Sequence, residues 1–331
     1  MERFALAAAV VLGFALTAAL CSLFVPLRRV LERREQNQQP AQSEQPRPAP
    51  LRAPLWGGLC AAAGTVAAVG VGWLAACVGQ PELLGSEGRL MTRLLTALAG
   101  SLAFGAVGFA EDLARMRSPA ALGLRRGVRL LLEALAAAFV LLLLQAAGCL
   151  PRGLDVPGAG YVLLGSAVPF LWAVLMVVLA ECARIAERDE GTVCGAAFVA
   201  MLALMMVEAG LGVPGLAVLP AALAGALVAL LLWAFPPARL GVGCCGSLLA
   251  AGAIGCIPLS LDMTSLTVPL ALPFWAAGGL LAAQLLGAKR TGKPLRCWVK
   301  KHKMSPETVF LCSFALSAVG YVLALALLRW C

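Results

Sequence analysis

The segment Gly108-Phe109-Ala110-Glu111-Asp112 places two adjacent acids at the end of a long apolar run, 93–110. A cluster of arginines follows it: Arg115, Arg117, Arg125, Arg126 and Arg129. The next apolar run is 128–149. Apolar runs of about 20 residues on both sides of a charged segment indicate two membrane-spanning helices joined by a polar loop. This pair of runs sets the pattern for the whole chain.

The composition of the chain agrees with a membrane protein. Of the 331 residues, 61% are hydrophobic and only 13% are charged. A water-soluble fold does not bury that much apolar surface, and the abundance of Leu and Ala argues against a β-barrel. The first apolar run, 4–26, is long enough to span and lacks an A-x-A cleavage site, so we expect it to remain as a helix.

Ten apolar segments are long enough to cross a bilayer core of about 30 Å. The sequence therefore predicts an all-α, polytopic membrane protein with about ten transmembrane helices in a single integral membrane domain, 1–331. The ten segments are 4–26, 55–78, 93–110, 128–149, 159–181, 193–211, 214–235, 241–260, 266–288 and 309–328.

The basic residues predict the topology. Loops that follow odd-numbered segments hold 21 of the 26 Lys and Arg residues, so we expect these loops in the cytoplasm and both termini outside. Two of them are long: a Gln- and Pro-rich loop, 27–54, which we expect to be mobile, and a basic loop, 289–308. The net charge of +9 thus fits anionic headgroups or phosphorylated substrates better than nucleic acid.

Most of the twelve cysteines lie inside apolar runs, where a thiol behaves as a small hydrophobic group. The adjacent Cys244 and Cys245 raise the question of a zinc site. Two vicinal thiols without a spaced second pair argue against it.

Four polar clusters fall on the predicted cytoplasmic side: 111–115, 184–191, 243–247 and 293–303, the last containing the only histidine, His302. In the second cluster, Glu187 and Glu190 are three residues apart and would share a helix face. In the third, a Gly-Cys-Cys-Gly-Ser turn at a helix start could present backbone N–H groups to a phosphate.

Convergent carboxylates suit Mg²⁺, and arginines and lysines beside them suit phosphates. The clusters together suggest phosphoryl-type chemistry on an anionic substrate at the cytoplasmic membrane face. The alternative is that each cluster is a solvated loop that obeys the positive-inside rule.

The order of the motifs resembles the polyprenyl-phosphate sugar-phosphate transferases (glycosyl transferase family 4), most closely the phospho-N-acetylmuramoyl-pentapeptide transferases. Residues 54–58 resemble the family's Pro-Thr-Met-Gly-Gly motif, and residues 108–115 resemble Gly-Phe-x-Asp-Asp-x-x-Lys. Residues 184–191 are similar to Asn-Leu-Thr-Asp-Gly-Leu-Asp-Gly, and residues 243–248 to Gly-Asp-x-Gly-Ser-Leu. Lys300-Lys301-His302 falls where the family has a triple-histidine loop.

The resemblance implies transfer of a sugar phosphate from a UDP-sugar to polyprenyl phosphate, with Mg²⁺ and release of UMP, in the synthesis of cell-wall or glycan lipid intermediates. It also implies a homodimer. Carried over position by position, the catalytic residues would be Asp112, Glu111, Glu187 and Glu190, with Asp112 and Glu190 on the metal. The substrate-binding residues would be Arg115, Arg184, Gly246, Ser247, Lys301 and His302.

The chain departs from the family at the positions that carry the chemistry. Among the acidic positions only Asp112 keeps the family's residue, while Cys244 replaces an aspartate with a thiol, a poor ligand for Mg²⁺. Arg115 and Arg184 replace a lysine and an asparagine. Two hypotheses stay open: a divergent transferase, or a catalytically inactive paralogue that binds lipid phosphate or a partner protein.

A minor alternative is a transporter, because Glu133 and Glu208 lie within apolar runs. Acids inside membrane helices are costly and often functional. A transporter would require one of them to line a cavity through the membrane.

Overall fold

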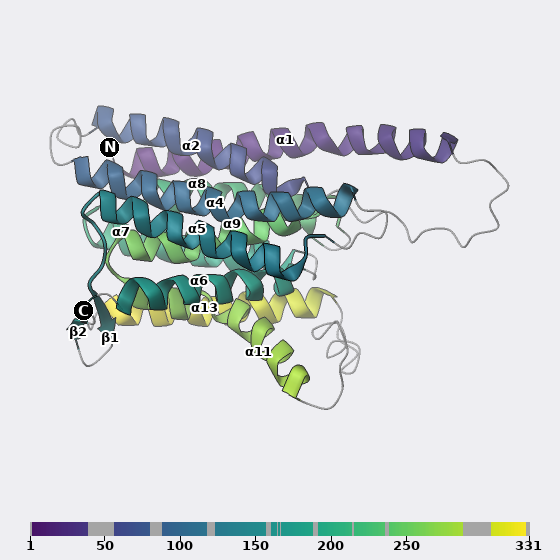
Figure 1. Ribbon diagram of the computed structural model, residues 1–331. Helices are drawn as coiled ribbons and strands as arrows, with labels where there is room; N and C mark the ends of the chain where they lie inside the picture. The colour runs from purple at the N-terminus through teal and green to yellow at the C-terminus, as the bar shows by residue number, and fades with distance from the viewer. Residues whose placement is uncertain are drawn as a thin grey trace.

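The computed structural model describes residues 2–38, 56–79, 88–117, 123–156, 160–163, 165, 167–187, 191–213, 215–235, 238–286 and 306–328. Long helices run side by side through the bundle and a small hairpin lies at one end (Figure 1). The helices are α1 (Glu2–Gln38), α2 (Gly57–Gly79), α4 (Gly88–Arg117), α5 (Arg126–Ala146), α6 (Ala167–Ala186), α7 (Thr192–Gly210), α8 (Val218–Ala234), α9 (Gly243–Ser260), η1 (Thr264–Leu266), α10 (Thr267–Leu270), α11 (Leu272–Leu286) and α13 (Pro306–Leu328).

Within these described residues, eight helices are long and apolar enough to cross a membrane, which confirms a polytopic helical membrane protein. The two predicted spans that fall short are those of α8 and α11. The helix α8 has 17 residues and ends just before Pro236-Pro237 in the sequence. A proline disfavours a helical conformation of the residue that precedes it. The run 266–288 is divided at Ala271, between Pro269 and Pro273, which lack the N–H that a continuous helix needs.

The fifth predicted span, 159–181, begins too early. Its first residues form β2 (Gly160–Leu163), which pairs antiparallel with β1 (Gly153–Val156), and α6 begins only at Ala167. Gly160 and Gly165 have φ of 72° and 59°, which favour glycine and end the helical pattern. The all-α prediction therefore misses one hairpin, because the apolar residues Tyr161, Val162 and Leu163 have the composition of a membrane span.

The predicted loop 27–54 is also partly helical, because α1 continues to Gln38. Residues 27–38 are rich in Leu, Arg, Glu and Gln and contain no glycine or proline, a composition that favours helix. Residues 39–55 and 287–305, which include most of both predicted long loops, lie outside the described residues.

The centre of the bundle is α9, in which every residue is buried. It packs along α4 and also touches α2, α6 and α7. Glycines permit this close packing: a Cβ on Gly252 would lie 3.0 Å from the Cα of Ser101 on α4. The start of α9 is thereby fixed against its neighbours at one end of the bundle.

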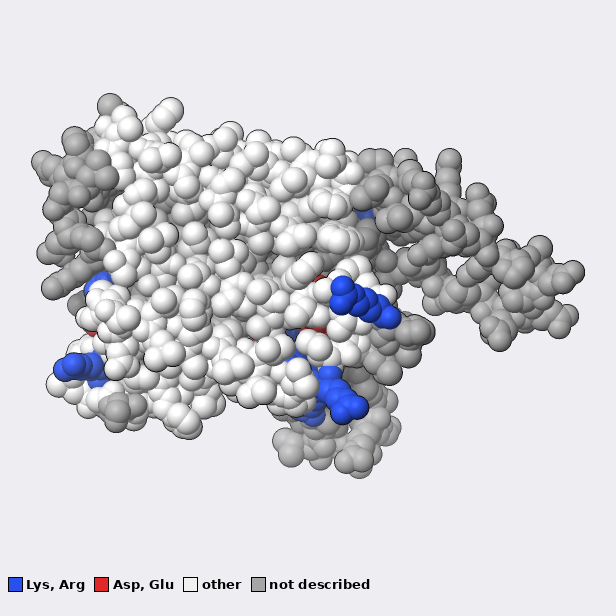
Figure 2. Space-filling view, turned by 45° about the horizontal axis from the view of Figure 1, so that its top comes forward, with Lys and Arg blue, Asp and Glu red and all other residues white. Residues whose placement is uncertain are grey.

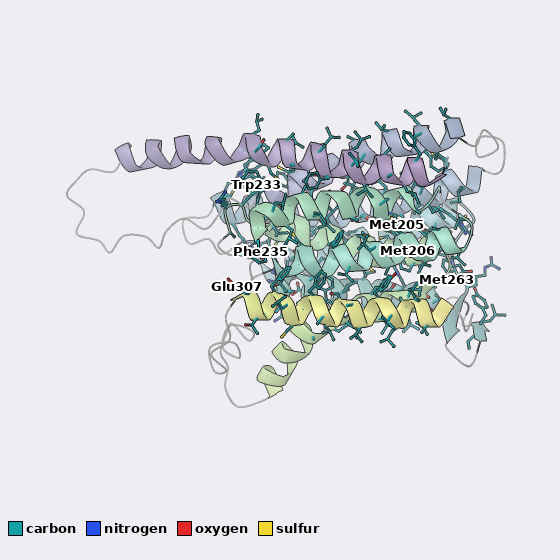
Figure 3. All side chains as sticks on the ribbon, turned by 180° about the vertical axis from the view of Figure 1, so that it is seen from behind. Met205, Met206, Trp233, Phe235, Met263 and Glu307 are labelled. Carbon is teal, nitrogen blue, oxygen red and sulfur yellow. The ribbon has the colours of Figure 1, made fainter. Side chains whose placement is uncertain are left out.

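Charged side chains gather at both ends of the bundle. Figure 2 shows an uncharged belt between basic side chains at either end, with acidic side chains scarcely visible on this face. Figure 3, from behind, places Phe235 of the α8 end and Glu307 of the α13 start together at one end and Met263 at the other. The ring of Phe235 packs edge-on against Phe310 of α13, with 5.4 Å between ring centroids.

Candidate functional site

Asp112, near the end of α4, caps the start of α9. Its Oδ1 accepts the Cys244 N–H at 3.0 Å and its Oδ2 accepts the Cys245 N–H at 2.9 Å, and the residue is only 1% exposed. The first N–H groups of a helix lack internal partners and carry partial positive charge, so a carboxylate there is stabilised. No side chain of α9's own N-cap, Val242, performs this role.

Two glycines allow the backbones to meet at this point. A Cβ on Gly108 of α4 would collide with the Cys244 carbonyl oxygen and lie 2.7 Å from the Cys245 nitrogen. A Cβ on Gly58 of α2 would collide with the Gly246 nitrogen. The N–H groups of Gly57 and Gly58 donate to the carbonyls of Gly241 and Val242 at 3.2 and 2.9 Å. The motif 56–58 therefore fastens α2 to the segment that enters α9.

The Arg115 guanidinium lies among three carboxylates. Its Nη2 is 2.7 Å from Glu111 Oε1, and its Nη1 is 3.8 Å from Asp112 Oδ1 and 3.9 Å from Glu187 Oε2. Glu111 and Asp112 are buried, and the Arg115 side chain is 20% exposed. A cation of the chain itself thus neutralises the acids that α4 and the end of α6 bring together.

A second arginine, Arg129 on α5, extends the network. Its Nε donates to Glu181 Oε1 on α6 at 2.7 Å and lies 3.9 Å from Glu133 Oε1, and its Nη1 is 3.6 Å from Glu111 Oε1. Glu181 also accepts from Arg184 Nη2 at 2.5 Å. These eight residues form what we call the acid–arginine network: Glu111, Asp112, Arg115, Arg129, Glu133, Glu181, Arg184 and Glu187.

The network contains five acids and three arginines and is not fully satisfied. Glu111 Oε2, both oxygens of Glu133 and Arg184 Nε are buried without a hydrogen-bond partner among the described residues. A buried polar atom without a partner costs free energy, so this end of the bundle retains capacity for further hydrogen bonds.

The structure brings together some of the predicted site residues and assigns others to packing. Glu111, Asp112, Glu187 and Arg115 converge, and Arg184 joins them through Glu181. Ser247 Oγ donates to the Cys244 carbonyl at 3.1 Å, and Gly246 packs against Gly58. The Cys244 and Cys245 amides, expected to face a phosphate, are instead taken by Asp112.

Three predicted site residues, Glu190, Lys301 and His302, lie outside the described residues. Conversely, the sequence prediction assigned no role to Arg129 and did not single out Glu181. The i,i+4 spacing of Arg129 and Glu133 and the i,i+3 spacing of Glu181 and Arg184 were the only local signals.

The described residues do not fit a Mg²⁺ site. In the part of the chain that the structure describes, no three His, Cys, Asp or Glu side chains are grouped so as to hold a metal ion. Both Asp112 oxygens face α9 amides, and Cys244 Sγ lies 4.0 Å from Glu187 Oε2, a thiol where a carboxylate ligand would be needed. Among the described residues, Cys244 and Cys245 likewise have no group of side chains around them that would complete a zinc site.

The fold and this network define a polytopic membrane protein with acids and arginines gathered where α4, α5, α6 and α9 meet at one end. Residues 94–262, just over half of the chain, match Glycosyl transferase family 4. The chain belongs to this family, and the predicted resemblance is confirmed.

Several curated relatives are phospho-N-acetylmuramoyl-pentapeptide transferases, to which the chain is distantly homologous. The protein from Desulforudis audaxviator is 34% identical over 170 residues, 48% of this chain and 50% of the relative. The protein from Mycobacterium tuberculosis (strain H37Rv) is 28% identical over 265 residues, 72% of each chain. The protein from Synechococcus sp. is 32% identical over 215 residues, 63% of this chain and 55% of the relative. The alignment with the first of these thus spans half of that relative's length.

Proposed function

We propose that this protein is a divergent relative of the polyprenyl-phosphate sugar-phosphate transferases that has lost Mg²⁺-dependent transfer and binds a polyprenyl phosphate at the network end. We further propose ten transmembrane segments, both termini outside and the network end facing the cytoplasm. The positive-inside distribution of 21 of the 26 basic residues supports this orientation.

One observation carries the loss of transfer: the Arg115 guanidinium lies where the acids of the site converge. It contacts Glu111 at 2.7 Å and lies within 4 Å of Asp112 and Glu187. This planar guanidinium engages several carboxylates at once, whereas the lysine of the family motif is a compact point charge, so Arg115 leaves fewer carboxylate oxygens for a divalent cation. Asp112, the one unchanged acid of the family motif, is in turn held by α9.

Exposed arginines around the network support the binding of a lipid phosphate. Arg117, Arg125, Arg126 and Arg239 are all exposed, while the acids of the network are buried or half-buried. The surface at this end is therefore basic although its interior is acidic. Guanidinium groups bind phosphate with paired donors, and each basic residue near an anionic headgroup contributes about 1 kcal/mol.

The second candidate is an active transferase with an altered site. The observation in its favour is that three of the four predicted catalytic acids, Glu111, Asp112 and Glu187, do converge. The transporter alternative has less support, because Glu133 is 0% exposed beside Arg129 and Glu208 is 1% exposed within α7.

A UMP-release assay separates the two candidates. Purified full-length protein is incubated with polyprenyl phosphate, Mg²⁺ and a panel of UDP-sugars, and a phospho-N-acetylmuramoyl-pentapeptide transferase is assayed in parallel. We expect no UMP from this protein with any sugar, and a measurable gain from Cys244→Asp combined with Arg115→Lys. Mg²⁺-dependent release of UMP by the unaltered protein would overturn the proposal in favour of the transferase.

Binding is tested separately with polyprenyl phosphate and, as the ligand control, the corresponding polyprenol. We expect the phosphate to bind more tightly, and the double variant Arg125→Gln, Arg126→Gln to lower its affinity by roughly tenfold to thirtyfold. The double variant Arg125→Lys, Arg126→Lys keeps both charges and should retain most of the affinity for polyprenyl phosphate. Equal affinity for the phosphate and the alcohol would refute lipid-phosphate binding, whatever the outcome of the UMP assay.

A further inference from the structure

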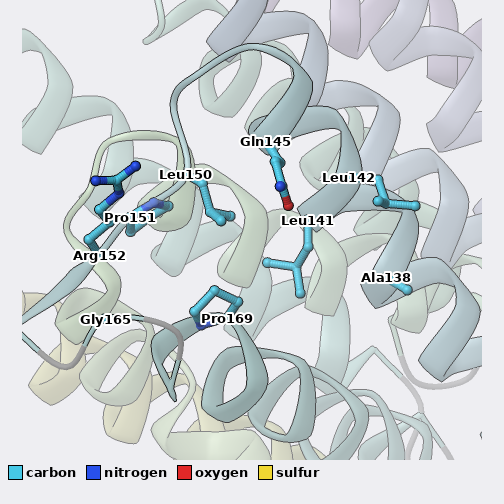
Figure 4. A pocket seen from close by; sticks show the side chains of 9 residues that line it. All are labelled: Ala138, Leu141, Leu142, Gln145, Leu150, Pro151, Arg152, Gly165 and Pro169. Atoms are coloured by element: carbon cyan, nitrogen blue, oxygen red, sulfur yellow. The ribbon is translucent and has the colours of Figure 1, made fainter.

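At the end of the bundle opposite the network, a hollow opens between α5 and α6. Its volume is about 700 Å³, within the range of sites that bind small molecules. Figure 4 shows its lining side chains. Three elements form it: the last turns of α5, the segment that leads into β1, and the first turn of α6 with Gly165 before it.

The α5 wall is an apolar strip that ends in one polar side chain, Gln145. Ala138, Leu141, Leu142 and Gln145 line the hollow and follow each other at helical i, i+3, i+4 and i+7 spacing. Such a strip is roughly 10 Å long, given a rise of 1.5 Å per residue. Ala138 and Leu142 are exposed on this surface, so the strip faces the surroundings of the bundle rather than its core.

The opposite wall is also apolar. Leu150, Pro151 and Pro169 complete the apolar lining, and the two polar side chains are Gln145 on α5 and Arg152 beside the hairpin, with Leu150 and Pro151 between them (Figure 4). The Arg152 backbone is fixed, since its carbonyl accepts the Gly165 N–H at 2.9 Å. The Arg152 side chain is exposed and forms no ion pair with an acid among the described side chains.

Neighbouring residues place Arg152 at the boundary between the membrane core and water. Tyr161 on β2 is 47% exposed, and its hydroxyl donates to Asp262 Oδ2 at 3.4 Å. Tyrosine is enriched at membrane–water interfaces, where its ring meets lipid and its hydroxyl meets polar groups. The hollow has apolar walls below that level and, at that level, a guanidinium that pairs with no acid among the described side chains. This arrangement matches an amphiphile with a single negative charge.

We propose that this hollow is a binding site for an anionic phospholipid, with one acyl chain along the α5 strip and the phosphate at Arg152. The lipid belongs to the leaflet opposite the network. Its site shares no residue with the polyprenyl-phosphate site proposed above, and either proposal can fail without the other.

The test is native mass spectrometry of delipidated full-length protein titrated with phosphatidylglycerol or with phosphatidylcholine. We expect the unaltered protein to retain phosphatidylglycerol with about fivefold higher affinity, and Arg152→Gln to abolish that preference. Arg152→Lys keeps the charge and should keep the preference. Arg152 is exposed at the start of the hairpin, so these variants should fold normally.

A second pair of variants tests the apolar strip. Ala138→Trp should fill the hollow and reduce retention of both lipids at least fivefold, whereas Ala315→Trp, at an exposed position of α13, should leave retention unchanged. The proposal is overturned if the unaltered protein shows no preference between the lipids, or if Ala138→Trp and Ala315→Trp behave alike. The proposal would also be overturned if polyprenyl phosphate bound at this site more tightly than phosphatidylglycerol, that is, if Arg152→Gln removed a tighter binding of polyprenyl phosphate.

Discussion

The helices α5 and α6 carry opposite kinds of site at their two ends. At the network end, Arg129 of α5 and Glu181 of α6 are joined at 2.7 Å within a buried cluster of charges. At the hairpin end, the same two helices separate around an apolar hollow that ends in an exposed arginine. The charges on and beside α5 and α6 are thus buried at the network end, where exposed arginines surround them, and exposed at the hairpin end. This contrast predicts that the first end is held together by polar pairs whose loss is costly, and the second by apolar packing with little dependence on its charges.

The largest expected effect comes from removing the centre of the network. Arg129→Ala leaves Glu111, Glu133 and Glu181 with one cation fewer among buried side chains. Breaking a buried ion pair from one side costs about 3–5 kcal/mol. We expect a large drop in the thermal unfolding midpoint in detergent, or a failure to accumulate in the membrane.

Arg152→Ala at the hairpin end is the matched control, and its unfolding midpoint should stay at that of the unaltered protein. If the two variants lose the same stability, the contrast between the ends is wrong. If Arg129→Ala unfolds completely, the milder Glu181→Gln takes its place. It removes the charge that Arg129 and Arg184 contact at 2.7 and 2.5 Å, so it should lower the midpoint measurably, which Arg152→Ala should not.

The second effect tests the close approach of α4 to α9. Gly108→Ala would place a methyl group against the Cys244 carbonyl and 2.7 Å from the Cys245 nitrogen, so the helices must move apart. Overpacking of this kind costs about 1–3 kcal/mol. Gly127→Ala on α5 is the control, since a Cβ there meets no atom within 4 Å. A Gly108→Ala variant as stable as Gly127→Ala would show that the α4–α9 contact is looser than the structure has it.

Sequence reasoning reached the class and the family because each of these is local. Apolar run lengths, basic loops and the Gly-Phe-Ala-Glu-Asp motif can be read in one stretch of chain. The pairing of Arg129 with Glu181 could not be predicted in this way, because it joins residues 52 apart whose meeting depends on how α5 packs on α6. The hairpin was missed because Tyr161-Val162-Leu163 is apolar like a span, and only the backbone of Gly160 and Gly165 distinguishes it.

A third variant separates the two roles open to Asp112, cap and ligand. Asp112→Asn keeps one acceptor oxygen for the α9 amides but replaces the other with a donor, which faces the Cys244 or Cys245 N–H. We expect a loss of about 1–2 kcal/mol, the range for a helix cap with its charge. Addition of Mg²⁺ should not change the unfolding midpoint of either the variant or the unaltered protein. If Mg²⁺ instead raises the midpoint of the unaltered protein but not that of the Asp112→Asn variant, Asp112 is a metal ligand.

The smallest effect belongs to the hairpin end. Tyr161→Phe removes the hydroxyl that reaches Asp262 across an exposed 3.4 Å contact, and the ring remains in place. Because water can donate to the Asp262 carboxylate in place of the lost hydroxyl, stability should change by no more than about 0.5 kcal/mol. Thermal unfolding side by side with Arg129→Ala measures this difference directly. A loss comparable to that of the network variant would mean that the hairpin, too, depends on a polar pair, and the two ends of α5 and α6 would no longer differ in what holds them.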